Sequence, residues 1–267
     1  MLLAIDIGNT NVTFGVFRDK TLVTTWRIET DVNRMPDEYA LILLNLLQLQ
    51  GTAPGDISGV ALCSTVPPLV AVFEELCQRY FKTKPFMLVP GVRTGVRVRT
   101  DNPREVGADR IANAVAAHHL YQCPAIIVDV GTATTFDVVS KEGDFLGGAI
   151  ATGITTAAEA LYRRAAALPR VELVHPKQVI GTNTIAAMQS GIVYGYVGLV
   201  EGIVTRMQRE LGSRATVIAT GGYASIITGE TAIFDAVNPD ITLIGLRLVY
   251  EMNQPQPEGG ATTRGTG

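Results

Sequence analysis

Cysteine and histidine are scarce in this sequence of 267 residues, with three of each. They are Cys63, Cys77, Cys123, His118, His119 and His175. The cysteines are odd in number, far apart and never in a Cys-x-x-Cys pair, which argues against a disulfide framework and a zinc site. The two adjacent histidines lack ligand spacing, because neighbouring residues on a helix point about 100° apart. A reducing environment fits this composition, and we expect a cytoplasmic protein.

A strong net charge is also lacking. The formal net charge is −3 and the pI is near 5.7, so no global field attracts nucleic acid or an anionic membrane surface. Long apolar runs are missing as well, since residues 185–204 are interrupted by Gln189, Ser190, several glycines and Glu201. We therefore expect no nucleic-acid partner and no membrane span, and any phosphate must be held by local groups.

Two common nucleotide-binding signatures are absent from the chain. It contains neither G-x-x-x-x-G-K-[ST] nor G-x-G-x-x-G, which are typical of P-loop and Rossmann sites. A nucleotide site in this protein must therefore be built in another way.

What the sequence does contain is an internal repeat. Residues 4–14 (AIDIGNTNVTF) resemble residues 127–136 (IVDVGTATTF), and Asp6 and Asp129 are 123 positions apart (129 minus 6). Each copy has an apolar strand with an Asp near its end, a Gly that permits a tight turn, and small hydroxyl residues that lead into a second β-rich run. Because the offset is nearly half the chain, the repeat predicts two halves of similar construction.

The pattern around the repeats predicts an α/β protein with mixed sheets flanked by helices. Each repeat predicts a β-hairpin, with third strands over 21–28 and 144–151. Helical spacing covers 39–50, 67–81, 107–121, 154–167, 184–211 (one long helix or a kinked pair) and 243–252, and strand-like runs cover 57–62, 86–89 and 215–220. We place an N-terminal half at 1–118 and a C-terminal half at 119–253, and expect a disordered tail over 254–267.

The polar tips of the two predicted hairpins suit phosphate and metal binding. The tip that begins at Asp6 offers a carboxylate and amide and hydroxyl side chains for Mg²⁺-bound water and phosphate oxygens. The tip that begins at Asp129 offers a second such set, and two facing loops would clamp a triphosphate from both sides. One copy alone is equally well explained as an Asx-stabilised turn. Farther along, Gly221 and Gly222 follow a strand and would let the backbone approach adenine or ribose.

The segment 101–113 (DNPREVGADRIAN) has two explanations. Asp109 can accept a hydroxyl proton and Arg110 can pair with a carboxylate, with Gly107 allowing close approach. From the residues alone, a loop that enters a helix with two charges in its first turn is the simpler explanation.

The order of these motifs resembles actin, Hsp70 and sugar kinases. That resemblance implies two duplicated ribonuclease H-like halves of the actin-like ATPase fold, with ATP in the cleft between them. Five motifs together resemble the type III pantothenate kinase family over residues 1 to about 252. They are residues 6–13, Asn102-Pro103, residues 107–110, residues 129–135, and residues 181–191.

The family resemblance implies an ATP-dependent kinase that converts pantothenate to 4'-phosphopantothenate in coenzyme A biosynthesis. It implies that Asp109 accepts the hydroxyl proton, that Asp6 holds Mg²⁺ through water, and that Asp129 binds a monovalent cation, K⁺ or NH₄⁺. It implies an ATP site of Asp6, Ile7, Gly8, Asn9, Thr10, Asn11, Val12, Thr13 and Thr132, and a pantothenate site of Gly107, Ala108, Asp109, Arg110 and Thr184.

The same resemblance implies a homodimer in which Thr184 reaches pantothenate across the interface. The glycine-rich side of residues 191–202 would form the seam. One departure is Thr100, where many family members have Tyr, so this chain lacks an aromatic side chain at that place. The alternatives are a kinase of the same fold for another small acid or sugar, and a regulatory or transcription accessory homologue without turnover.

Overall fold

The structure is a computed structural model that describes residues 1–255. Its strands are β1 (Leu2–Ile7), β2 (Asn11–Arg18), β3 (Thr21–Glu29), β4 (Gly59–Ser64), β5 (Phe86–Met87), β6 (Ala125–Val130), β7 (Ala133–Val139), β8 (Phe145–Thr152), β9 (Thr216–Thr220) and β10 (Ala236–Val237). Its helices are α1 (Pro36–Leu49), α2 (Pro67–Leu76), α3 (Ala108–Leu120), α4 (Ile154–Arg164), α5 (Thr184–Leu211), α6 (Ala224–Thr228) and α7 (Ile241–Met252). Shorter turns are η1 (Pro54–Asp56), the π-helical η2 (Cys77–Phe81) and η3 (Pro103–Glu105).

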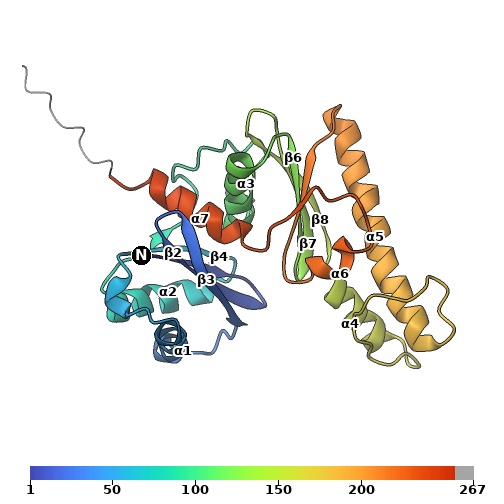
Figure 1. Cartoon of the computed structure of the whole chain (residues 1–267), viewed down its shortest axis with the longest axis horizontal. Coiled ribbons are helices and arrows are strands. Elements are labelled where there is room, and N and C mark those ends of the chain that lie inside the picture. The colour runs from blue at the N-terminus through green and yellow to red at the C-terminus, as the bar shows by residue number, and fades with distance from the viewer. Residues whose placement is uncertain (256–267) are drawn as a thin grey trace, which may run out of the picture.

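The two sheets have the same topology, which confirms the predicted duplication. The first is ordered β3-β2-β1-β4-β5 and the second β8-β7-β6-β9-β10. In each, the first three strands along the chain are antiparallel and the last two run parallel to the first strand. The sheets are mixed, as expected, and helices cover them (Figure 1). Residues 184–211 form one helix, not a kinked pair.

Each sheet is packed on both faces. The first sheet buries Leu3, Ile5 and Phe14 against α1 and α2, while α7 packs on its other face against β1 and β4. The second sheet has α3 against β6 and β7 on one face, and α5 and α6 cover the other through a cluster that includes Phe136 and Val200. Side chains along a strand alternate between the two faces of the sheet. Helices therefore pack against the buried side chains on either face.

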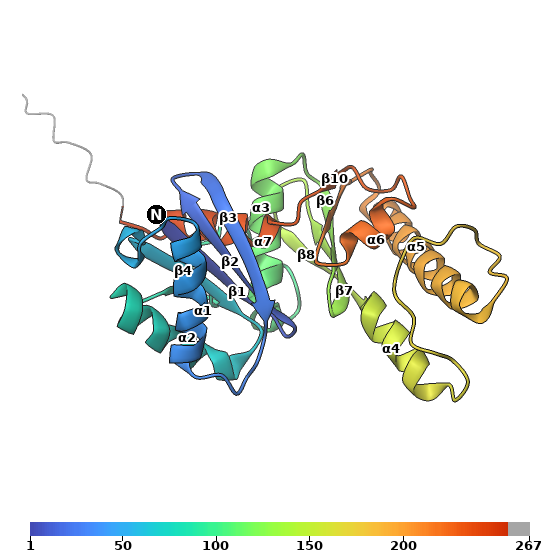
Figure 2. The same ribbon diagram turned by 60° about the horizontal axis from the view of Figure 1, so that its bottom comes forward.

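Helices α3 and α7 pack together between the two sheets (Figures 1 and 2). Their closest approach is at Gly245, where an added Cβ would lie 2.0 Å from the Ala112 carbonyl oxygen, so only glycine fits this crossing. Helix α7, the last helix that the structure describes, thus belongs spatially to the first sheet. The boundary drawn at residue 118 stays a prediction, and most of the tail predicted from residue 254 lies outside the described residues.

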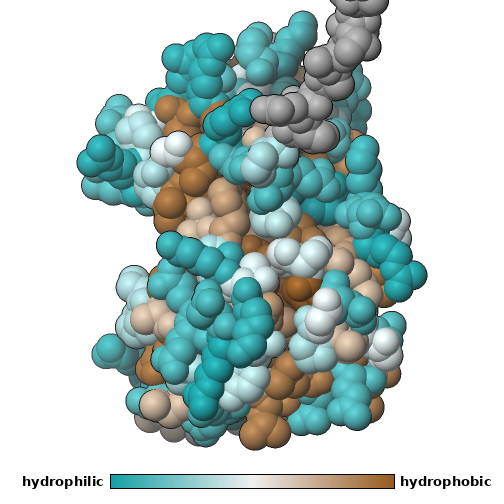
Figure 3. All heavy atoms as spheres, turned by 90° about the vertical axis from the view of Figure 1, so that its left-hand side faces the viewer, coloured by the Kyte–Doolittle hydropathy of each residue, from teal (hydrophilic) through white to brown (hydrophobic). Residues whose placement is uncertain are grey.

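The surface at the first-sheet end of the molecule is mostly hydrophilic, with hydrophobic side chains gathered in strips between polar ones (Figure 3). Among residues 1–255, no helix is long and apolar enough to cross a membrane.

Candidate active site

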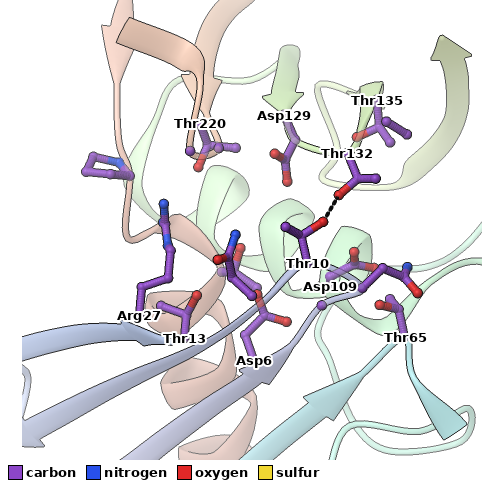
Figure 4. A pocket seen from close by; sticks show the side chains of 18 of the residues that line it. Asp6, Thr10, Thr13, Arg27, Thr65, Asp109, Asp129, Thr132, Thr135 and Thr220 are labelled. Carbon is purple, nitrogen blue, oxygen red and sulfur yellow. Dashed lines mark hydrogen bonds between the residues drawn. The ribbon is translucent and has the colours of Figure 1, made fainter. Parts of the chain in front are cut away.

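The tips of the two repeated hairpins face each other across a cleft between the halves (Figure 4). Each tip is a tight turn closed by one backbone bond, from the Gly8 amide to the Asn11 carbonyl and from the Gly131 amide to the Ala133 carbonyl, both 3.0 Å. The hydroxyls of Thr10 and Thr132 share a hydrogen bond of 2.5 Å across the cleft. The two loops that the sequence singled out are therefore in direct contact.

Strand register arranges the side chains of each half in a row at the level of the cleft. Neighbouring residues in a row belong to adjacent strands, whose side chains at paired positions share one face of the sheet. The first row is Cys63, Asp6, Thr13 and Arg27, and the second is Thr220, Asp129, Thr135 and Ile150. The carboxylates of the repeat thus occupy equivalent places on β1 and β6.

Both of these carboxylates have a perturbed acidity. Burial, with repulsion from Asp109 and from Asp129, raises the pKa of Asp6 from 3.8 to about 7, although the Cys63 thiol donates to its Oδ1 over 3.2 Å. Burial, with repulsion from Asp109 and Asp137, raises the pKa of Asp129 to about 7. The site therefore carries more negative charge than its own residues neutralise, and a bound cation would lower both pKa values.

Asp109 enters the cleft from the first turn of α3. Gly107 precedes the helix with extended backbone, and an added Cβ there would clash with the Asp109 carboxylate. The Arg110 amide donates to Asp109 Oδ1 over 2.9 Å. Burial raises the pKa of Asp109 against the lowering effect of this bond and of the Arg110 charge. The carboxylate lines the same cavity as Asp6 and Asp129, in reach of a group bound between the hairpin tips.

Arg110 points away from this cavity toward the second sheet. Its Nε donates to Oδ1 of the fully buried Asp137 over 2.7 Å, and its Nη2 lies 2.5 Å from the same oxygen. The guanidinium also lies over the Phe145 ring at 5.5 Å. Burial raises the pKa of Asp137 to about 6 even though Arg110 favours its charged form. The pair fixes the direction of the Arg110 side chain.

The remaining predicted substrate residues lie apart from the phosphate loops. Gly107 and Ala108 line a neighbouring cavity with Ser64 and Val106, beside the start of α3. Thr184 is exposed at the start of α5, one residue after Asn183, which caps that helix by accepting from the Ala186 amide over 2.9 Å. It borders a groove between α4 and α5 and does not line the cleft of its own chain.

The donor set fits a divalent cation that is bound mainly through the nucleotide. Within residues 1–255 no group of three or more His, Cys, Asp or Glu side chains is arranged to enclose a metal ion. Mg²⁺ commonly takes one or two carboxylates together with waters and substrate phosphates. Asp6, in the cleft beside the first phosphate loop, would supply such a carboxylate.

The structure brings together most of the predicted ATP residues. Those that line the cleft are Asp6, Gly8, Asn9, Thr10, Asn11, Thr13 and Thr132, together with Asp109 and Asp129. Ile7 and Val12 are fully buried, so their side chains belong to the core and only their backbone follows the loop. The lining residues outside the predicted set are Arg27, Thr65, Ala133, Thr135, Thr220, Gly221, Gly222, Tyr223, Pro239, Thr242 and Leu243.

Some of these additions had a signal in the sequence, because Ala133 and Thr135 belong to the repeated motif over residues 129–135. Gly221 and Gly222 stand out as adjacent glycines after a strand. Arg27 is one of two charged residues on β3, with Glu29, and only the pairing of β3 with β2 places it at the cleft.

Comparison with known proteins agrees with the motifs. The family described as type III pantothenate kinase matches residues 2–206. A type III pantothenate kinase from Dehalococcoides mccartyi is 52% identical over 253 residues, covering 95% of this chain and 96% of that protein. One from Moorella thermoacetica is 54% identical over 253 residues, covering 95% of this chain and 100% of that protein.

Solved structures with low sequence identity share the fold. A structure described as a Baf family transcriptional activator from Campylobacter jejuni has a TM-score of 0.60 at 18% identity, covering 94% of this chain and 98% of that one. A structure described as a 2-dehydro-3-deoxygalactonokinase from Sinorhizobium meliloti has a TM-score of 0.56 at 13% identity, covering 97% and 99%. These likenesses support the actin-like architecture alone. With the match over most of its length and half its residues identical to named relatives, the chain belongs to the type III pantothenate kinase family.

Proposed function

We propose that this protein transfers the γ-phosphoryl group of ATP to the primary hydroxyl of pantothenate, giving 4'-phosphopantothenate and ADP in coenzyme A biosynthesis. The relatives that share half of its residues are named for pantothenate phosphorylation. The observation that carries the proposal is the pair of repeated loops joined through Thr10 and Thr132, with three carboxylates around one cleft. This is an arrangement for phosphoryl transfer by positioning and charge stabilisation.

Asp109 is the proposed proton acceptor. The substrate oxygen forms a bond to the γ-phosphorus while the bond from that phosphorus to the bridging oxygen of ADP breaks, and the hydroxyl proton passes to Asp109. In a loose transition state this proton leaves late, so the carboxylate serves chiefly to orient the hydroxyl. Bound Mg²⁺ would neutralise charge on the phosphates, and Asp6 would hold it through water.

Asp129 is the proposed ligand of a monovalent cation, K⁺ or NH₄⁺. Its buried carboxylate holds a proton up to about pH 7 without a counter-ion, which supports a role in binding positive charge at neutral pH. Such a cation would lie on the opposite side of the phosphates from Asp6, because the two residues occupy equivalent places on facing sheets.

Pantothenate is assigned to the start of α3. Gly107 and Ala108 line the neighbouring cavity, and Asp109, the next residue along the chain, lines the cleft. Arg110 would contribute through the guanidinium donors left free by its single acceptor, Oδ1 of Asp137. We expect the substrate carboxylate on this side of the site.

We further propose a homodimer formed along α5, with Thr184 of each chain reaching the substrate of the other. Among residues 1–255, no atom lies within 4 Å of a Cβ added at Gly191, Gly195 or Gly198, so their small size serves no contact within this described part. Exposed hydrophobic side chains lie in and around this region. They are Leu161, Tyr162, Val174, Val179, Ile180 and Ile185. An interface there would bury them. A cytoplasmic location stays a prediction.

The test is ADP release by the purified protein with Mg·ATP and pantothenate, in the presence and absence of K⁺ or NH₄⁺. We expect turnover that requires pantothenate, is not supported by sugars, and increases with the monovalent cation. Asp109→Asn should lower this turnover at least about a hundredfold while leaving ATP binding intact. A protein that binds ATP but gives no turnover with any cation would contradict the proposal and favour a regulatory role.

A further inference from the structure

Arg27 is the one basic side chain among the residues that line the cleft. It extends from β3 beside Thr13 toward the opposite half, and Figure 4 shows it on the same side of the cavity as Thr220. Three carboxylates line the same cavity. A triphosphate bound among them brings further negative charge, so a side-chain cation at this place bears directly on nucleotide binding.

The guanidinium of Arg27 has no partner in the described part of the chain. Several other arginines are paired, as Arg110 is with Asp137 and Arg214 with Asp235. Arg27 makes neither an ion pair nor a hydrogen bond with any residue from 1 to 255, although its charge lowers the pKa values of Asp6 and Asp129. Its five donors therefore face the cleft unused, in the planar arrangement that suits phosphate oxygens.

The position of Arg27 lies between the two ends of the nucleotide site. Toward the reacting end, it is paired with Thr13, which is in turn paired with Asp6. Toward the other end, its Nη1 is 2.9 Å from the place of an added Cβ on Gly222, in the glycine turn that suits adenine or ribose. Adjacent strands are about 4.8 Å apart, so Arg27 stands about 10 Å from Asp6 across the sheet. In a nucleotide that spans these two ends, the α- and β-phosphates would lie nearer to Arg27 than the transferred γ-phosphoryl.

The two rows differ in charge at the position of Arg27. In the second half the equivalent place on β8 is held by Ile150, which is 67% exposed. The places of Asp6 and Thr13 are held by an Asp and a Thr in the second row as well, while Thr220 stands where the first row has Cys63. Of the two rows, only the one in the first half therefore contains a positively charged side chain that can contact the nucleotide.

We propose that Arg27 binds the α- and β-phosphates of ATP and ADP and bridges the first sheet to the Gly221–Gly222 turn when nucleotide is bound. This inference rests on the proposed kinase function of the cleft. Because these phosphates keep their charge from substrate to product, the contact strengthens binding of ATP and ADP alike and contributes little to the chemical step.

A purely structural role would have different consequences. If Arg27 served only to offset the carboxylates or to support the glycine turn, its loss would weaken adenosine and ADP binding to the same extent. If it binds phosphate, affinity for adenosine is unchanged and affinity for ADP falls. The difference between the two ligands thus separates the explanations without any need for turnover.

The experiment compares Arg27→Met, Arg27→Lys and the control Arg18→Met by titration calorimetry with adenosine and ADP, and by steady-state kinetics. Arg18 is an exposed arginine at the far end of β2 from the cleft, so its replacement removes the same charge from the same sheet. Charge-assisted hydrogen bonds of this kind predict a loss of about ten- to one-hundredfold in ADP affinity and a similar rise in KM for ATP for Arg27→Met. We expect kcat to change less than about threefold, with partial recovery in Arg27→Lys and wild-type behaviour in Arg18→Met.

Two results would overturn the assignment. One is unchanged ADP affinity in Arg27→Met, and the other is a parallel loss of adenosine binding. A wild-type protein that binds ADP but does not phosphorylate pantothenate would contradict the proposed function instead, and the comparison of adenosine with ADP would still decide the role of Arg27.

Discussion

Asp129 carries a carboxylate at the end of β6 whose pKa burial raises from 3.8 to about 7. Below pH 3.8 it is protonated in the folded and the unfolded chain alike. Between these values the unfolded chain ionises while the folded one keeps its proton, so the stability that the group confers at low pH is lost as the pH rises through about 7. Replacing Asp129 by Asn should therefore stabilise the cation-free protein at pH 8.

The magnitude follows from the same two pKa values. Their difference corresponds to about 4 kcal/mol of unfolding free energy, at about 1.4 kcal/mol for each pH unit. The side chain is partly open to the cleft, so solvent screening reduces this value and we expect about 2 kcal/mol. For a chain of this size, about 2 kcal/mol raises the melting temperature by about 4–8 °C.

The assay is thermal unfolding of wild type and Asp129→Asn at pH 5.5 and pH 8, with and without K⁺. Wild type should lose stability toward pH 8 and regain part of it with K⁺, because a cation favours the ionised carboxylate. The variant should be more stable than wild type at pH 8 and indifferent to K⁺. Asp144→Asn, which removes a carboxylate of the same half outside the cleft, controls for the change in net charge.

The reasoning is refuted if Asp129→Asn is no more stable than wild type at pH 8 and loses stability with pH as steeply. That result would mean that groups of the folded chain already neutralise the negative charge of the Asp129 carboxylate. If the variant is stabilised yet still responds to K⁺, the ionised Asp129 carboxylate destabilises the fold as argued, but the cation binds at another place.

Three further expectations concern individual residues of the site. Asp109→Asn should lower kcat by about 10²–10⁴-fold with KM for ATP nearly unchanged, measured by ADP release. Asp137→Asn removes the charged partner of Arg110 from a buried pair. We expect the free energy of unfolding in urea to fall by about 3–5 kcal/mol and the KM for pantothenate to rise. An unchanged KM would exclude Arg110 from the substrate site. Thr184→Val should raise KM for pantothenate while sedimentation still shows a dimer, and a monomeric wild type would contradict the shared site.

The fold was predictable because the repeat fixes the topology. Once Asp6 and Asp129 are seen as equivalent, the hairpins, their third strands and the later parallel strands follow from patterns of period two and from helices that connect parallel neighbours. The short elements were not predictable. Strand β10 has two residues and α6 has five, which is too little for a period to show.

The site was predictable only where one stretch of chain makes it. The hairpin tips meet as expected because each tip is local and the duplication places them face to face. Arg27 and Asp137 depend on which residues pair across strands, and a shift of one residue would have turned either side chain to the other face of its sheet. No local pattern in the sequence predicts which residues pair across these strands.

The crossing of α7 with α3 has a consequence for biosynthesis. The first sheet is nearly complete once residue 87 has been made, yet the helix that covers one of its faces is the last described element of the chain. During translation that apolar face stays uncovered until residues 241–252 have been made. In that interval it is exposed to solvent or bound by a chaperone. Late truncations before α7 should therefore yield aggregates of the first half, not a free nucleotide-binding fragment.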